Sequence, residues 1–230
     1  MENGWSIKKL NELICGSAVY QQSHRTVAAT ADPENRLLSF FPRRRLEAEV
    51  LRDSMLLVSG ELDRKLGGPL MSVLNRTYAN GGNAPANIAN QMHYDAPRRS
   101  LYLPVIRNAV YDLFSVFDFP DPGVITGQRA QTTTAPQALF LMNSPFVVER
   151  AEAFAKRLQT LGGDDAARLR SAYEIAAVRS PLAAETARAL AYLDQEELLL
   201  KSSGEEAPRH KAWARLCQAL LASNEFLYLR

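Results

Sequence analysis

GQRAQTTTAPQALFLMNSP, residues 127–145, decides how the C-terminal half of the chain is divided into helices. Thr134 and Gln137 have the spacing of a capping box, in which the two side chains satisfy free backbone N–H groups at a helix start. Pro145 disfavours helical geometry at Ser144, so a second helix should begin at Pro145 after a break. Apolar residues occupy every side of the first, short helix, which predicts that this helix is buried.

Working outward, apolar periodicity and helix-stop residues predict a mainly α-helical fold. Alternation over 99–106 predicts a short strand, and Pro104 confines it to a sheet edge. Residues 66–99 are rich in Gly, Asn and Pro and predict a long loop, of a kind that is often functional. We therefore expect an irregular helical domain with a small β element, spanning residues 1–230 as one domain. The expected helices lie near 7–20, 42–60, 108–117, 135–142, 145–161, 165–178, 181–201 and 208–222.

The composition is that of an ordinary globular protein. The chain has 230 residues, of which 47% are hydrophobic and 23% charged, and its net charge is +2. Such a small charge predicts no general attraction to nucleic acid, and the sequence predicts neither a membrane span nor a signal peptide. Arginine outnumbers lysine by 21 to 6. This excess indicates either a GC-rich genome or a use of the planar guanidinium in buried ion pairs and oxyanion recognition.

Cysteine and histidine give no metal or haem site within this chain. Cys15 and Cys217 are far apart and each lies in an apolar-periodic segment, which predicts two buried, unbridged thiols. The three histidines lack ligand-like spacing, and no CxxCH motif is present. We therefore expect no metal and no cofactor bound to these residues.

Polar residues crowd the entrance of the short helix that follows Thr134. Arg129, Gln131, Thr132 and Thr133 are not needed for capping, and the positive end of a helix dipole suits an anion. Arg98, Arg99 and Arg107 border the expected strand, and with Arg129 they form the best oxyanion-binding candidate. The alternatives are that the threonine side chains form hydrogen bonds with the backbone of their own loop, and that the arginines pair with Asp112, Asp118 or Asp121.

Two weaker constellations involve carboxylates. Arg45, Glu49 and Arg52 would share one helix face, flanked by other charges including Glu47 and Asp53. They form either a binding site for a sulfate or carboxylate group, with the arginines oriented by Glu49, or a row of intrahelical ion pairs. Asp118 and Asp121 lie in a loop stiffened by prolines, where they could act as an acid and a base or bind Ca²⁺, although no EF-hand-like loop is present. The alternative is ordinary turn chemistry.

Six ordered blocks of this sequence resemble the planctomycete-type C-terminal domain, the domain of unknown function numbered 1553. Together they cover essentially the whole chain. The blocks are GWSIKKLNELICGSAVYQQS (4–23), DPENRLLSFFPRRRLEAEVLRDSMLLVSGELD (32–63), GGP (67–69), RRSLYLPVIRN (98–108), FDFPDPGVITGQRAQTTTAPQALFLMNSPFV (117–147) and AWARLCQALLASNEFLYL (212–229).

The resemblance implies a domain that follows a second domain of unknown function, often behind a cytochrome-c-like haem domain, in large exported proteins. It implies an extracytoplasmic location and upstream partner domains, but it carries no catalytic residues. Three functions follow as hypotheses. The first is an accessory module that binds an anionic polymer, such as a polysaccharide, or a partner domain. The second is a polysaccharide-active enzyme that uses Asp118 and Asp121, and the third is a structural support for electron transfer by the haem domain.

Overall fold

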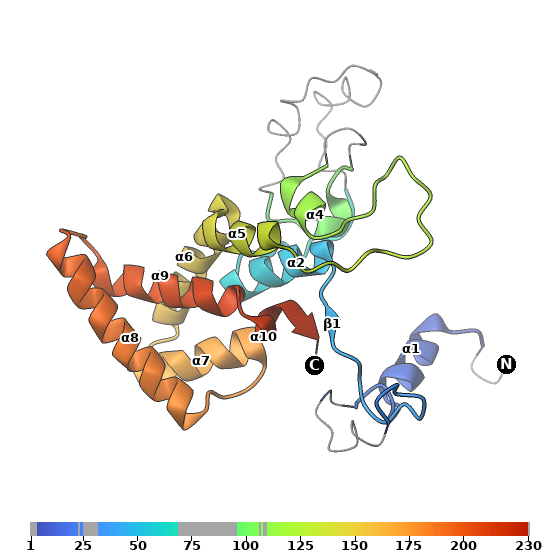
Figure 1. Ribbon diagram of the computed structural model, residues 1–230, viewed down its shortest axis with the longest axis horizontal. Helices are drawn as coiled ribbons and strands as arrows, with labels where there is room; N and C mark the ends of the chain where they lie inside the picture. The colour runs from blue at the N-terminus through green and yellow to red at the C-terminus, as the bar shows by residue number, and fades with distance from the viewer. Residues whose placement is uncertain are drawn as a thin grey trace. The chain divides into compact units, whose positions relative to one another are not determined.

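The computed structural model describes residues 4–22, 24, 32–68, 96–105, 107 and 110–229. These residues divide into two compact units, the first of Met1–Arg45 with Tyr228–Arg230 and the second of Leu46–Leu227. Figure 1 shows the elements of both. The structure is mainly helical with a small antiparallel sheet, which confirms the predicted fold class. That residues 1–230 act as one domain stays a prediction.

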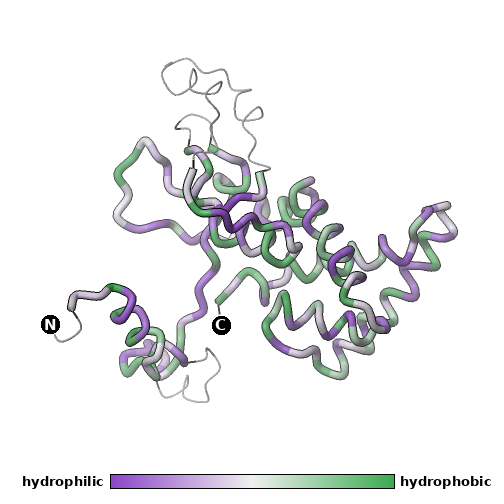
Figure 2. Tube along the Cα trace, turned by 180° about the vertical axis from the view of Figure 1, so that it is seen from behind, coloured by the Kyte–Doolittle hydropathy of each residue, from purple (hydrophilic) through white to green (hydrophobic). Residues whose placement is uncertain are grey.

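The first unit contains one helix and the sheet. Helix α1 (Ile7–Cys15) begins as predicted at Ser6, whose hydroxyl accepts a 3.4 Å hydrogen bond from the Lys9 N–H, but it ends at Gly16. Apolar and hydrophilic segments alternate along this helix, which lies next to the N-terminal mark in Figure 2. None of its residues is buried. Strand β1 (Arg44–Arg45) pairs antiparallel with β2 (Tyr228–Leu229).

The second unit holds the hydrophobic core. Helix α6 (Pro145–Thr160) packs against both α2 (Ala48–Ser59) and α9 (Pro208–Leu221), and α9 also packs against α8 (Ala183–Ser202), as Figure 1 shows. Phe154 and Leu158 of α6 and Trp213 of α9 are almost completely buried at the centre of this arrangement. The elements are α2 (Ala48–Ser59), the 3-10 helix η3 (Ser100–Tyr102), α4 (Asp112–Val116), α5 (Ala135–Asn143), α6 (Pro145–Thr160), α7 (Asp165–Ala177), α8 (Ala183–Ser202), α9 (Pro208–Leu221) and α10 (Asn224–Leu227).

The break between α5 and α6 is confirmed. Ser144 is extended, with φ −65° and ψ 128°, and α6 begins at Pro145. At the start of α5 the Gln137 side chain accepts a 3.3 Å hydrogen bond from the Thr134 N–H, as a capping box requires. The prediction that α5 is buried on all sides is wrong. Its buried residues are Gln137 and Leu141, whereas Leu139 and Met142 are 56% and 64% exposed.

Two elements differ from expectation because of contacts that are distant in sequence. Residues 100–102 form η3 in place of the expected strand over 99–106, because the Asp53 carboxylate accepts the Ser100 N–H at 2.7 Å and fixes a turn there. Helix α2 begins at Ala48 and not near Pro42, because Arg44 and Arg45 pair with β2. The expected helix face that combined Arg45 with Glu49 and Arg52 is therefore wrong.

Both cysteines are free thiols, as predicted. Cys217 is fully buried in α9, but Cys15 is exposed, so the prediction of burial is wrong for Cys15. The physical reason is that α1 buries none of its apolar residues within its unit. Among the described residues, the helices lack the combination of length and apolar character that a bilayer crossing requires.

Candidate functional site

Helix α2 presents a row of polar side chains that hold two distant segments of the chain. Glu49, Arg52 and Asp53 occupy positions i, i+3 and i+4, which lie on one face of a helix. Arg52 and Asp53 bind the segment 96–100, and Glu49 binds Arg129. These contacts determine where most of the predicted site residues lie.

Arg52 is a buried support for the segment that carries Arg98 and Arg99. Its side chain is fully buried and donates hydrogen bonds to the carbonyls of Ala96, at 2.7 Å, and Arg98, at 2.9 Å. Burial lowers the pKa of Arg52 from its ordinary value, while the neighbouring Tyr111 and Asp53 oppose the change. Its bonds to these two carbonyls give Arg52 a structural role, and ligand binding by Arg52 stays a prediction.

Asp53 holds the same segment from the next position of α2. Its carboxylate accepts hydrogen bonds from the N–H and the hydroxyl of Ser100, at 2.7 and 2.6 Å. The two bonds fix the backbone where η3 begins, one residue after Arg99. Sequence reasoning treated Asp53 only as a flanking charge, because its partner lies 47 positions away.

Arg98 is bound to other parts of the protein. Its guanidinium donates to the carbonyls of Lys65 and Gly67, at 3.1 and 2.7 Å, and lies 3.7 Å from an Asp63 oxygen. It also lies 4.5 Å from the centre of the Tyr102 ring, a cation–π contact. Arg98 therefore joins residues 63–67 to residues 98–102.

Arg129 forms a two-pronged ion pair with α2. Its two terminal nitrogens donate to the two oxygens of Glu49, at 2.7 and 2.9 Å, and one of them lies 3.2 Å from Glu47. The hydrogen bond to Glu49 raises the pKa of Arg129. This ion pair agrees with the alternative from the sequence, in which the arginines pair with carboxylates of the protein and do not bind an anion. The partners are residues of α2, however, and not Asp118 or Asp121, because the fold brings the loop before α5 to the first turn of α2.

The carboxylates of Asp118 and Asp121 each hold a turn. Asp118, whose φ is +60°, accepts hydrogen bonds from the N–H and the hydroxyl of Thr132, both at 2.8 Å. The Thr132 hydroxyl in turn accepts a 3.2 Å bond from the buried Gln137 side chain. Asp121 accepts the Gly123 N–H at 2.8 Å. Thr133 is exposed beside this chain of bonds.

A pocket of about 380 Å³ opens beside this face of α2. Its polar lining residues are Glu49, Asp53, Arg99 and Ser100, and its apolar ones are Val50, Leu101, Leu103, Val105, Phe114 and Phe119. The rings of Phe114 and Phe119 are stacked, with centroids 5.1 Å apart. Its volume lies in the usual range of ligand pockets, about 300–1,000 Å³, and six of its ten lining residues are apolar.

Arg99 is the cation that lines this pocket, and its guanidinium makes no ion pair with any described residue. Its side chain is exposed. Glu49, the partner of Arg129, lines the same pocket, so two of the predicted arginines lie at or next to one site. Arg107 is also exposed, but the pocket lining does not include it, and Arg45 belongs to β1 in the first unit.

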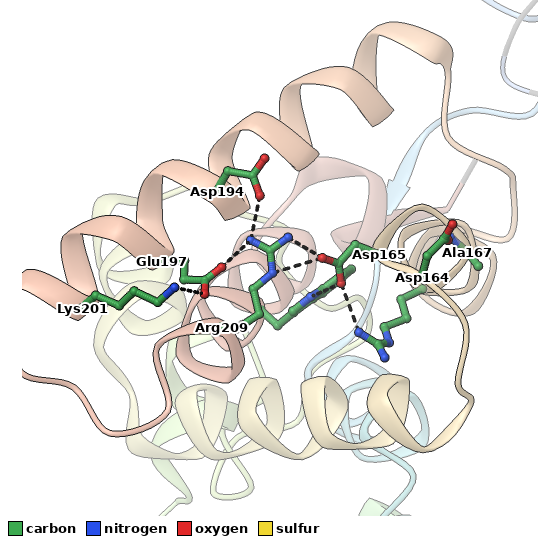
Figure 3. Close-up of polar contacts among 9 residues, drawn as sticks. Asp164, Asp165, Ala167, Asp194, Glu197, Lys201 and Arg209 are labelled. Carbon is green, nitrogen blue, oxygen red and sulfur yellow. Dashed lines mark hydrogen bonds and ion pairs between the residues drawn. The ribbon is translucent and has the colours of Figure 1, made fainter.

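A second polar cluster joins α7, α8 and α9 (Figure 3). The Arg209 guanidinium bonds to Asp165 and lies 3.0 Å from Asp194 and 3.2 Å from Glu197. Burial alone would raise the pKa of Asp165, but hydrogen bonds from Arg209 and Trp213 lower it. Because the carboxylates that converge on Arg209 are paired with it, we interpret this cluster as a tie between helices. Sequence reasoning did not find it.

The described residues contain no group of three or more His, Cys, Asp or Glu side chains that could hold a metal ion. A search for similar proteins found no match among curated proteins and none among solved structures. A family model does match residues 1–193, so the match ends before the block 212–229 that the resemblance includes. Since that match covers most of the chain, the protein belongs to the PSD1 family, described as proteins of unknown function (DUF1553).

Proposed function

We propose that this protein is a non-catalytic binding module, whose α2 pocket recognises an anionic group on a polymeric or protein partner through Arg99. One observation carries the proposal. Arg52, Arg98 and Arg129 are all bound within the protein, whereas Arg99 lines a pocket with no ion-pair partner among the described residues. Arginine suits this task because its planar fork of donors matches carboxylate and sulfate groups.

The alternative, an enzyme that uses Asp118 and Asp121, receives less support. Acid–base catalysis needs a side chain within reach of the proton that it transfers. Both carboxylates accept hydrogen bonds from their own loops, and neither lines the α2 pocket. We therefore favour binding over catalysis.

The test of this function is binding to anionic polymers by isothermal titration calorimetry. Chondroitin sulfate and poly-glutamate are the anionic probes, and dextran is the neutral one. We expect both anionic probes to bind and the substitution Arg99→Ala to weaken them about tenfold, a loss of about 1.4 kcal/mol. Arg170→Ala is the matched control, since Arg170 is an exposed arginine of α7. Equal binding of dextran, or no effect of Arg99→Ala, would contradict the proposal.

The wider context is part of the same proposal and rests on the family resemblance alone. We propose that the module belongs to an exported, haem-associated protein of the planctomycete type, where any haem would lie in another domain. Fractionation of the source cells followed by mass spectrometry tests this location. Recovery of the peptides only in the cytoplasmic fraction would count against export.

A further inference from the structure

We infer that the ligand of the α2 pocket is a protein segment that presents one carboxylate beside apolar side chains. This inference rests on the proposed function and names the class of partner for the same site. It follows from the polar groups of the pocket, the apolar walls and the exposed rim.

The carboxylates of the pocket are occupied by other groups of the protein. The Asp53 carboxylate is bonded to the N–H and hydroxyl of Ser100, and both Glu49 oxygens are bonded to Arg129. Arg99 is therefore the lining group that offers unused donors among the described residues. A sugar ring carries many hydroxyl groups, and burying them without partners costs free energy. One available cation instead suits a ligand with one anionic group.

The walls of the pocket suit an apolar body attached to that anion. Leu103 and Phe114 are 6% and 3% exposed and form the most buried part of the apolar wall. Phe119 stacks on Phe114 and also lies under the Arg129 guanidinium, 5.5 Å from ring centroid to carbon. The hydrophobic effect therefore favours an aliphatic or aromatic side chain at this place over water.

The rim indicates a ligand larger than the cavity. Val50, Leu101 and Val105 line the pocket but remain 46%, 74% and 50% exposed. A small molecule that fills the cavity would leave much of this apolar surface in water. An extended protein segment can place one side chain inside, a second over Leu101 and a carboxylate on Arg99. Buried apolar contacts and an arginine pair are the usual centre of a protein interface.

The experiment uses an array of nine-residue peptides with a central Asp or Glu and apolar residues at varied positions on both sides. One matched array replaces the acid by its amide, and another replaces the apolar residues by serine. We expect acidic–apolar peptides to bind the full chain and both matched arrays to bind at least about tenfold more weakly. If amide and acid peptides bind equally, the inference is wrong.

Variants of exposed residues then assign the binding to this pocket without disturbing the core. Arg99→Gln should abolish the preference for acid over amide, and Leu101→Ser should weaken both kinds of peptide. Arg170→Gln and Leu198→Ser are matched controls, because these exposed residues lie on α7 and α8. Full acid preference in Arg99→Gln would overturn the inference.

The anionic polymers separate a failure of this inference from a failure of the proposed function. If chondroitin sulfate binds in a manner that depends on Arg99 and no peptide binds, the partner is a sulfated glycan. The inference is then wrong, while the proposed function stands. If neither the peptides nor the polymers bind through Arg99, both are wrong.

Discussion

At the scale of single residues, arginine side chains connect segments that are far apart in sequence. Arg52 binds carbonyls of residues 96 and 98, and Arg157 of α6 binds the carbonyls of Leu57 and Val58 at the end of α2, at 2.9 and 2.8 Å. One guanidinium can reach two acceptors at once, which a lysine ammonium does less well. A GC-rich genome is therefore not needed as the sole explanation for the excess of arginine over lysine, because several arginines here link distant segments of the backbone.

Arg52 provides the first prediction at this scale. Arg52→Met fills a similar volume but leaves the carbonyls of Ala96 and Arg98 without their buried donor. We expect a loss of about 3–5 kcal/mol in the free energy of unfolding, measured with urea. Arg170→Met, on an exposed position, is the control and should cost less than about 0.5 kcal/mol. If Arg52→Met lost no more unfolding free energy than this control, the segment 96–100 would be held by other contacts.

The two thiols give a second prediction. Cys217 is buried in α9, and burial raises the pKa of its thiol, whereas Cys15 is exposed. Because the thiolate is the reactive form, only Cys15 should react with Ellman's reagent in the folded protein. Both thiols should react in guanidinium chloride. Cys15→Ser should remove the fast reaction, and a prompt reaction that persists in this variant would contradict the burial of Cys217.

At the scale of elements, the sequence predicts those boundaries that depend on neighbouring residues. The start of α1 at Ser6, the break at Ser144 and the glycine end of α2 at Gly60, whose φ is +85°, all follow from local capping. The start of α2 and the form of residues 100–102 could not be predicted, because each depends on a partner elsewhere in the chain.

In the candidate site, too, the sequence predicts features that depend on neighbouring residues and misses those that depend on distant ones. The sequence could single out Arg99 and Arg129 as cations near a polar entrance. It could not pair Arg129 with Glu49, which lies 80 positions earlier. It also could not anticipate that Phe114 and Phe119 would form a pocket wall, since periodicity alone cannot distinguish core residues from a ligand site.

The connection between α7, α8 and α10 provides the third prediction. Arg179 donates to Glu185 at 2.7 and 2.8 Å and also binds Glu225. The hydrogen bonds from Arg179 lower the pKa of Glu185 from 4.5 to about 2. The folded protein therefore holds this proton less tightly than the unfolded chain. The stabilisation is complete above the unfolded pKa and is lost as the pH falls from about 4.5 towards 2.

Glu185→Gln tests this contribution. We expect a loss of about 1–3 kcal/mol at pH 7 and a shallower dependence of the unfolding free energy on pH between 4.5 and 2. Urea unfolding at several pH values measures both quantities. Glu206→Gln is the control, since Glu206 is exposed and unpaired among the described residues. An unchanged pH dependence in Glu185→Gln would show that this carboxyl is not linked to stability.

At the scale of the whole molecule, the burial of apolar side chains is uneven along the chain. Among the described residues, the buried hydrophobic side chains all lie between Ala48 and Leu227. Helix α1 buries none of its nine residues, and isolated helices of this length are marginal in water. The hydrophobic driving force for folding is therefore concentrated in the second unit.

The last prediction follows from that distribution. A chain of residues 46–227 should fold cooperatively, with an unfolding free energy within about 1 kcal/mol of the full chain, because it keeps the buried apolar core. Urea unfolding followed by circular dichroism and by fluorescence measures this. The shorter chain keeps Trp213, which is buried in the core, and lacks Trp5, which is 82% exposed. Coincident transitions from the two signals would show that the core unfolds as one unit. A loss of several kcal/mol would instead show that residues 1–45 add packing to this core, as the expectation of one domain over residues 1–230 requires.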